Sequence, residues 1–368
     1  MAIVWERDAL KQYLSDAFEA AAEHSILIDR FLENAYELDV DAVSDGNSVV
    51  IAGVMQHIEE AGVHSGDSAT VIPPYMISQR DQDRIRRRTI ELARALKVVG
   101  LMNVQYAIAA GELNVLEVNP RASRTVPYVS KATGVAFAKI AALAMAGRSL
   151  AEQGLRAEPR PPRYFVKAPV FPFSRFPAED TVLGPEMKST GEVMGSAETF
   201  GEAYSKALLG AGVAFPASGT AFVSVNNHDK RPVVVQLVKE LIDLGFKLVA
   251  TRGTRDFLQS HGVPAELVFK VHEGRPNIVD LMINDQISLV INTPMGKSAF
   301  YDDTYIRRTS LQRSIPCLTT LFAAAACVEG IRESRESSGE LLSLQEQHGI
   351  AGERSNPRLI LSPETVGS

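Results

Sequence analysis

The sequence has few of the residues that would tie it to an oxidising compartment, a membrane or a nucleic acid. Its 368 residues include only two cysteines, Cys317 and Cys327, whose apolar neighbours favour reduced thiols in a cytoplasmic protein over disulfides or a zinc site. The formal net charge is −6 and no dense basic cluster occurs, so nucleic acid is not expected as the main partner. No apolar run is long enough to span a bilayer, and residues 1–14 lack the regions of a signal peptide, so no membrane association is expected.

What is present is enough apolar material for well-filled cores. Hydrophobic residues make up 45% of the chain and charged residues 22%, as in ordinary globular proteins. A length of 368 residues predicts two or three domains. A proline-rich stretch, residues 155–176, is expected to connect or wrap rather than to form a regular core element.

The part of the chain before this stretch alternates between strand and helix signals. The apolar run Ile26–Leu32 predicts a buried strand, Glu37–Val43 alternates as a second strand does, and Ser48–Met55 predicts a third. Gln79–Leu96 has the period of an amphipathic helix, and alanine-rich Val135–Ala146 predicts a buried helix. The pattern indicates a first domain that combines a sheet with helices.

After the proline-rich stretch come a predicted helix at Phe200–Leu209 and a linker at Gly210–Gly219, and from Thr220 a second unit of a different kind begins. The strands Ala221–Val225, Phe246–Ala250 and Ile287–Asn292 then alternate with helices, of which Pro232–Leu244 is the clearest. Such alternation predicts a parallel sheet, with a ligand site beyond the carboxyl ends of its strands.

The most informative stretch is a predicted hairpin, formed by Asn103–Ile108 and Leu113–Val118 around an Ala-Gly-Glu turn. With the turn centred on glycine, Gln105 lies opposite Glu117. Because side chains alternate along a strand, one face then collects the oxygen-bearing side chains of Gln105, Glu117 and Asn119. The other face collects apolar side chains, with Tyr106 opposite Leu116 and Val104 opposite Val118.

This hairpin has the chemistry of a phosphoryl-transfer site. Converging oxygen ligands suit a hard cation such as magnesium, and guanidinium groups, which follow at Arg121 and Arg124, match phosphate geometry. Two alternatives stay open. The polar face of the hairpin is solvated in one of them, and in the other a two-residue turn pairs Tyr106 with Glu117 and separates the ligand set.

Two further segments carry weaker signals in the first domain. Gly62–Ser68 has glycines that allow close backbone approach and contains His64 and Ser65 as donors to phosphate. It is not a Walker A loop, and taken alone it favours a plain surface turn. Arg30-Phe-Leu32 followed by Glu37 could line an adenosine pocket or simply be structural.

Polar residues in the second unit gather at predicted strand ends. Thr251-Arg-Gly-Thr254 follows a strand directly, where hydroxyls and backbone N–H groups at a helix start bind anions. Lys230, Lys270 and Asn292 lie at or near other strand ends. A phosphate site and a solvated loop are both open for this region.

Together these motifs resemble one family, the large subunit of carbamoyl phosphate synthetase, and specifically its C-terminal half. The resemblance is carried by Glu37-Leu-Asp-Val-Asp-Ala42, His57–Ser68, Gly100–Gln105, Glu117-Val-Asn-Pro-Arg121-Ala-Ser-Arg124-Thr-Val-Pro127 and Leu183–Gly195. It implies α/β and α+β folds: a partial ATP-grasp lobe with an antiparallel sheet and helices, followed by a Rossmann-like parallel α/β regulatory domain similar to methylglyoxal synthase. The implied divisions are 1–154 for the ATP-grasp part, 155–213 for a connecting segment and a helix that complete it, 214–335 for the regulatory domain, and 336–368 for a partly disordered tail.

The resemblance assigns residues to ATP and to magnesium or manganese. Gln105, Glu117 and Asn119 match metal ligands, and Arg121 and Arg124, with Asn119, match catalytic positions near the transferred phosphoryl group and carbamate. The nucleotide positions are Arg30, Leu32, Glu37, Gly62, Val63, His64 and Ser65, together with Gln105 and Glu117.

It also assigns two regulatory sites. Positions that hold a nucleotide effector in bacterial relatives, where uridylate inhibits and inosinate activates, are Ser224, Lys230, Thr251, Thr254, Lys270 and Asn292. Pro294 stands where relatives often carry a threonine that touches the effector, which leaves the effector's identity open. Glu59 and Asp67 match ornithine-binding carboxylates, but the third acidic position is Ala168, so a weak or absent response to ornithine is expected.

The implied activity is phosphorylation of carbamate by ATP to give carbamoyl phosphate, a ligase reaction that serves pyrimidine and arginine biosynthesis in the cytoplasm. The family's first half and the front lobe of its second ATP-grasp unit have no counterpart in these 368 residues, so the isolated chain is expected to be inactive. The expected partners are the remainder of the large subunit and a glutaminase small subunit. The alternatives are a non-catalytic effector-binding fragment, or a split-gene subunit that needs a partner chain.

Overall fold

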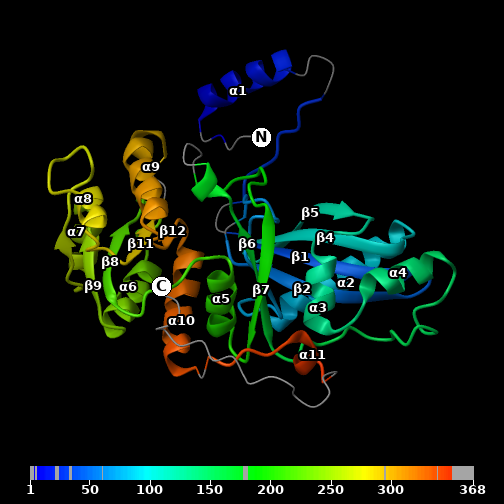
Figure 1. Cartoon of the computed structure of the whole chain (residues 1–368). Coiled ribbons are helices and arrows are strands. Elements are labelled where there is room, and N and C mark those ends of the chain that lie inside the picture. The colour runs from blue at the N-terminus through cyan, green and yellow to red at the C-terminus, as the bar shows by residue number, and fades with distance from the viewer. Residues whose placement is uncertain are drawn as a thin grey trace.

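The computed structural model describes residues 4, 6–20, 25–32, 35–59, 61–176, 181–293, 296–337 and 339–349. These residues form two sheets flanked by helices, with α5 (Phe200–Gly210) and α10 (Leu321–Glu336) between them (Figure 1). The helix α1 (Arg7–Ala20) stands apart from both sheets and has no buried residue. Within the described part, no helix is both long and apolar enough to cross a membrane.

The first sheet has seven strands in the order β5-β4-β1-β2-β3-β6-β7, and every neighbouring pair is antiparallel. The strands are β1 (Tyr36–Asp45), β2 (Val49–His57), β3 (Thr70–Ile72), β4 (Val99–Ala109), β5 (Glu112–Asn119), β6 (Tyr164–Val170) and β7 (Gly191–Ala197). Strand β1 is buried along almost its whole length. The predicted strands at Glu37–Val43 and Ser48–Met55 and the predicted hairpin all fall on observed strands.

The two faces of β1 have different partners because its side chains alternate. Leu38, Val40 and Ala42 belong to the core that packs under α2 (Gln79–Ala95), the helix predicted at this place. The opposite face is apolar only at its far end, where Val43 packs with α3 (Val126–Thr133) and α4 (Phe137–Met145). Nearer the start of β1 the same face carries three buried acidic residues, Glu37, Asp39 and Asp41.

Two expectations for this sheet were wrong. Ile26–Leu32 is not a buried strand: residues 25–32 are irregular, and Leu27 is 83% exposed. Strand β1, which follows, is already paired on both sides by β2 and β4, so no place beside it is open to this run. The proline-rich stretch does contain a regular core element, β6. Its Pro169 lies beyond the three residues that pair with β3, so the N–H that proline lacks is not required for a hydrogen bond to β3.

The second sheet has five parallel strands in the order β10-β9-β8-β11-β12, as the alternating pattern predicts. The strands are β8 (Gly219–Ser224), β9 (Phe246–Ala250), β10 (Glu266–Leu267), β11 (Leu289–Asn292) and β12 (Cys317–Leu318). The helices of this unit are α6 (Pro232–Asp243), α7 (Arg252–Ser260), α8 (Ile278–Ile283) and α9 (Gly296–Gln312). Both cysteines are free thiols.

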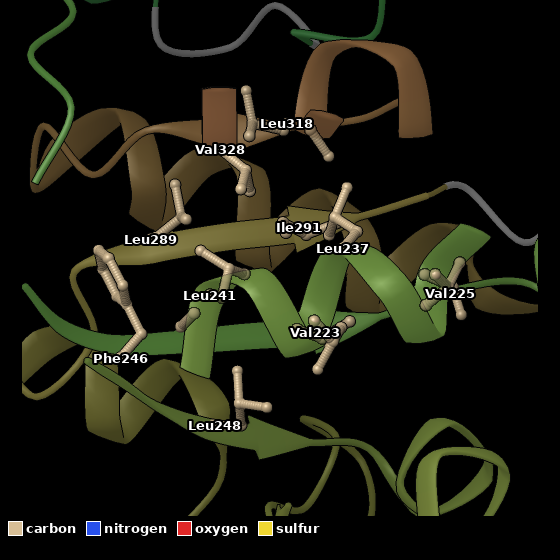
Figure 2. Close-up of a cluster of buried hydrophobic side chains, with 14 of the residues drawn as sticks. Val223, Val225, Leu237, Leu241, Phe246, Leu248, Leu289, Ile291, Leu318 and Val328 are labelled. Carbon is tan, nitrogen blue, oxygen red and sulfur yellow. The ribbon is translucent and has the colours of Figure 1, made fainter. Parts of the chain in front are cut away.

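One face of the parallel sheet is filled by branched aliphatic side chains (Figure 2). Val223 of β8, Leu248 of β9 and Ile291 of β11 meet Leu237 and Leu241 of α6 there. The other side of the same core is closed by α10, whose Val328 belongs to the cluster. Because α10 also packs on α5, this helix ties the parallel sheet to the antiparallel one.

The contact between α5 and α10 is close enough to require glycine. A Cβ atom at Gly201 would lie 2.8 Å from the backbone carbon of Glu329, and one at Gly330 would lie 3.1 Å from the carbonyl oxygen of Gly201. The short helices η1 (Phe173–Arg175) and α11 (Leu344–Gln347) complete the described elements. Most of the predicted tail, residues 350–368, lies outside the described residues.

Candidate functional site

The hairpin places the predicted ligand residues on one face. Gln105 of β4 lies directly opposite Glu117 of β5, and Asn103 lies opposite Asn119. The turn is Ala110-Gly111, both with positive φ, and a bulge follows between the turn and the site. The predicted pairing of Tyr106 with Leu116 was therefore wrong: Tyr106 pairs with Val115, and Leu116 is the extra residue of the bulge.

Strand β1 extends this polar face by two residues that the sequence reasoning did not assign. Asp39 pairs with Gln105, and Asp41 pairs with Asn103, so two polar rows run across β1, β4 and β5. The alternation of Glu37, Asp39 and Asp41 was visible in the sequence as a strand pattern. Nothing local showed that its polar side faces the hairpin, because the pairing joins residues more than 60 positions apart.

The polar rows form the floor of an open cleft of about 610 Å³. Its wall includes Lys167 of β6, which is buried and donates from Nζ to the carbonyl of Ser65 at 3.2 Å. Burial lowers the pKa of Lys167. The structure brings most of the predicted catalytic, nucleotide and metal residues together around this one cleft: Glu37, Gly62, Val63, His64, Ser65, Gln105, Glu117, Asn119, Arg121 and Arg124.

Two predicted nucleotide residues are not part of that lining. Arg30 is exposed and Leu32 is half-buried, and both lie in the irregular segment 25–32. Leu116, Asp39 and Asn103 take part in the lining instead. In the sequence, Arg30 and Leu32 belong to an apolar run that was predicted to form a strand. Because the run forms no strand, its composition does not determine where these two side chains lie.

The donor set at the hairpin fits a hard divalent cation. It offers one carboxylate, from Glu117, and two amide oxygens, from Gln105 and Asn119, and magnesium typically takes one or two protein carboxylates together with phosphate oxygens. Asn119 donates from Nδ2 to Glu117 and accepts from Arg121 at 3.1 Å, so side-chain bonds already orient the set. Among the described residues no group of three or more His, Cys, Asp or Glu side chains forms an all-protein metal site.

Beneath the cleft floor lies a buried ion pair. Nε2 of His57 is 2.9 Å from the Asp39 carboxylate. Burial alone raises the pKa of Asp39 and lowers that of His57, but the hydrogen bond and mutual attraction prevail, so the pKa of Asp39 is lowered and that of His57 is raised. Burial also raises the pKa of Glu37, which lies on the same face of β1. The pair gives the cleft floor a fixed charge distribution.

The predicted phosphate segment at Gly62–Ser68 is held against a loop from beyond β6. The N–H of His64 donates to Gly184 at 2.8 Å, and the Asp67 carboxylate accepts from the N–H groups of Lys188 and Ser189 at 2.7 and 2.9 Å. The other predicted ornithine residue, Glu59, accepts from the N–H of Ala69 at 2.6 Å. Both carboxylates therefore serve backbone groups of the chain itself.

The predicted effector residues of the parallel sheet largely come together. The Thr251 hydroxyl donates to Ser224 at 3.2 Å and lies 3.4 Å from that of Thr254, and Asn292 pairs with Ser224 across neighbouring strands. Lys230 lies beside the start of α7, 3.1 Å from where a Cβ of Gly253 would stand.

Three features of this region differ from the prediction or lie beyond it. Lys270 lies in the segment after β10, where its N–H donates to Glu273 at 2.9 Å. Thr293 was missed; its hydroxyl accepts from the N–H of Asn226 at 3.0 Å. Pro294 lies outside the described residues.

Comparison with known proteins finds two family models that match different parts of the chain. Residues 1–153 match the family model of the carbamoyl-phosphate synthase L chain, ATP binding domain, and residues 233–319 match that of the MGS-like domain. The carbamoyl phosphate synthase large chains of Acidobacterium capsulatum, Pasteurella multocida and Archaeoglobus fulgidus are 53%, 52% and 49% identical to this chain over the matched residues. In each case the match covers 95% of this chain and 32% of the relative.

The chain is a relative of the C-terminal portion of the carbamoyl phosphate synthase large chain. It spans about a third of the length of these curated relatives. The hairpin and its cleft floor lie in the part that matches the ATP-binding domain, and Thr251, Thr254 and Asn292 lie in the MGS-like part. A biotin carboxylase domain of a single-chain bacterial carboxylase aligns with 43% of the chain at a TM-score of 0.37 and 21% identity, a likeness too limited to add to this assignment.

Proposed function

We propose that this chain supplies the sheet side of the carbamate-phosphorylating site of a carbamoyl phosphate synthase, together with the regulatory domain of that enzyme. The observation that carries the proposal is the register of the hairpin. Gln105 and Glu117 are directly opposite each other, and Asn119 lies two residues further along β5, on the same face. Arg121 and Arg124 line the same cleft.

The chemistry would be transfer of the γ-phosphoryl group of ATP to carbamate. A carbamate oxygen attacks the γ-phosphorus, the new O–P bond forms, and the bond to the oxygen bridging β- and γ-phosphorus breaks to release ADP. Carbamate is already an anion, so no proton has to be removed from the nucleophile. The protein's task is then to position the groups and to stabilise charge.

The residues divide that task by their chemistry. Gln105, Glu117 and Asn119 would hold Mg²⁺, or Mn²⁺, which when bound neutralises charge on the phosphates. The guanidinium groups of Arg121 and Arg124 would take the oxygens of the moving phosphoryl group, for which their planar donors are suited. Glu37, at the other end of the polar face, would accept from ribose hydroxyls.

The second proposed role is regulation. Ser224, Thr251 and Thr254 gather hydroxyls at the carboxyl ends of β8 and β9, beside the first turn of α7 and the ammonium group of Lys230. Hydroxyl groups, backbone N–H groups of a helix start and a cation suit a nucleotide phosphate. A nucleoside monophosphate effector would bind here.

The proposal includes partners. The remainder of the synthase large chain would close the cleft from the other side, and a glutaminase small subunit would supply ammonia, in a cytoplasmic ligase that serves pyrimidine and arginine biosynthesis. The isolated chain is expected to bind Mg·ATP without forming carbamoyl phosphate. The same holds for a split-gene subunit. A purely regulatory fragment, in contrast, would bind a nucleoside monophosphate and not Mg·ATP.

Calorimetry on the purified chain tests the proposal. Mg·ATP should bind saturably, and Glu117→Ala should weaken binding about tenfold or more, because a metal-bound carboxylate is lost. Glu112→Ala is the matched control, since Glu112 is an exposed glutamate on the same strand that is not part of the cleft lining. Absence of Mg·ATP binding, or equal effects of the two substitutions, would overturn the catalytic assignment.

A further inference from the structure

One buried carboxylate, that of Asp41, accepts hydrogen bonds from two separate segments that line the cleft. Asp41 is 1% exposed. Its Oδ1 accepts from Asn103 at 2.9 Å and from the Ser123 hydroxyl at 2.8 Å, and its Oδ2 accepts from the Thr125 hydroxyl at 2.7 Å. Asn103 belongs to β4, whereas Ser123 and Thr125 belong to the segment that joins β5 to α3. Asp41 therefore connects this segment to the centre of the sheet.

The segment held in this way is the one that carries the arginines. Ser123 and Thr125 flank Arg124, and Arg121 lies two residues before Ser123. The hydroxyl oxygens of Ser123 and Thr125 are 2.7 Å apart, so the two anchors lie side by side on the Asp41 carboxylate. The side chains on either side of Arg124 thus point to the sheet, while Arg124 itself is exposed in the cleft.

The helix that follows begins without a side-chain cap. Thr125 is the N-cap residue of α3, a position where a threonine hydroxyl usually accepts from a backbone N–H of the first turn. Here Thr125 makes no such bond, and its hydroxyl donates to Asp41 instead. A threonine whose role was to stabilise the helix would be expected to make the capping bond. The observed hydrogen bonds therefore favour a role for Thr125 in holding the segment to Asp41.

We propose that Asp41 is a positioning residue, which fixes segment 121–125 to the sheet so that Arg124 faces the row of Gln105 and Glu117. Asp41 acts through Ser123 and Thr125 and touches no reacting group. The consequence for phosphoryl binding rests on the proposed function. The anchoring of the segment does not, and it can be measured without any ligand.

Hydrogen exchange on the full chain tests the anchor itself. Thr125→Val keeps the side-chain shape and removes the bond to Asp41. Thr89→Val is the matched control, because Thr89 is also buried and its hydroxyl bonds Ile85 and Tyr106 under α2, away from the cleft. Amides of residues 121–125 should exchange faster in Thr125→Val and not in Thr89→Val. Unchanged exchange in Thr125→Val would overturn the proposal whether or not nucleotide binds.

Mg·ATP calorimetry tests the consequence in a double-mutant cycle. Thr125→Val should weaken binding about tenfold, as expected for loss of one hydrogen bond to a charged group, and Thr89→Val should leave it unchanged. In the Arg124→Ala background Thr125→Val should add less than about a twofold loss, because the anchor acts through Arg124. An equal loss in both backgrounds would show a general structural role and overturn the proposal. If wild-type chain binds no Mg·ATP, the proposed function fails and the exchange result alone decides the anchor.

Discussion

Gln105 and Glu117 face each other across β4 and β5 only because a bulge separates them from the turn. From the Ala110-Gly111 turn, the regular ladder pairs Ile108 with Leu113 and Tyr106 with Val115. Continued without interruption, it would place Gln105 opposite Leu116 and turn Glu117 to the apolar face, because a one-residue shift exchanges the two faces of a strand. The extra residue at Leu116 restores the carboxylate to the polar side.

Shortening and lengthening β5 at the bulge should therefore affect Mg·ATP affinity differently. Deleting Leu116 leaves Glu117 as the next residue after Val115 and so keeps it opposite Gln105. We expect Mg·ATP affinity within about threefold of wild type. Inserting a glycine after Leu116 adds a second unpaired residue that the ladder cannot easily accommodate, and we expect affinity to fall by about tenfold or more.

The two length variants are compared by calorimetry, with circular dichroism to confirm that each is folded. Because one variant shortens and the other lengthens the same strand, damage to the hairpin as such would affect both. Loss of binding on deletion together with retention on insertion would show that the bulge does not set the position of Glu117.

The hairpin illustrates what the sequence could and could not provide. The alternation of side chains predicted that Gln105, Glu117 and Asn119 share a face, but the predicted turn centred on glycine was wrong. The pairing of Gln105 with Glu117 holds because of the bulge at Leu116, which the sequence did not predict. Asp41 escaped notice because its partners Ser123 and Thr125 lie more than 80 residues further along the chain.

Elsewhere, local composition was the weaker guide. The prolines argued against a core strand in residues 155–176, yet β6 forms there. Its neighbour β3 has only three residues and ends before Pro169, so no acceptor on β3 requires an N–H from this proline. Conversely, the apolar run at Ile26–Leu32 has the composition of a strand but forms none. The strand that follows it, β1, already pairs with β2 on one side and β4 on the other. In the parallel sheet, strand composition and alternation with helices predicted β8, β9 and β11 and their parallel pairing, but not the two-residue strands β10 and β12.

The titration of Glu59 should contribute measurably to the pH dependence of the free energy of unfolding. Burial raises the pKa of its carboxyl to about 7, although the backbone N–H groups of Glu59 and Ala69 lower it in part. In the unfolded chain the group titrates near its ordinary value of about 4.3. The folded state therefore binds this proton more tightly. The stabilisation is fully present below about pH 4 and is lost as the pH rises through about 7.

Glu59→Gln removes this dependence while keeping an acceptor for the N–H of Ala69. Between about pH 4.5 and 7.5 the free energy of unfolding of wild type, measured with urea, should fall by about 3 kcal/mol more than that of Glu59→Gln. The exposed Glu112→Gln should follow the wild-type profile. The comparison is needed because Asp41, whose pKa burial raises to about 6, shifts stability in the same direction. Parallel profiles for wild type and Glu59→Gln would contradict the assignment.

Ornithine should not stabilise this protein, because the carboxylates that match ornithine ligands are already engaged. Asp67 accepts from two backbone N–H groups that hold residues 188 and 189 against the cleft wall, and Glu59 accepts from Ala69. The third acidic position is occupied by Ala168, which is fully buried and offers no charge to an ammonium group. We expect the melting temperature measured by differential scanning fluorimetry to stay within about one degree when millimolar ornithine is added.

Asp67→Ala separates the structural role of this carboxylate from a ligand-binding one. Its removal leaves two N–H groups without their acceptor, so we expect a loss of about 2–3 kcal/mol in the free energy of unfolding, the same with and without ornithine. Asp67→Asn, which keeps one carbonyl oxygen, should lose less. A clear rise in the wild-type melting temperature on adding ornithine, abolished in Asp67→Ala, would instead show that Asp67 binds the amino acid and that Ala168 does not prevent it.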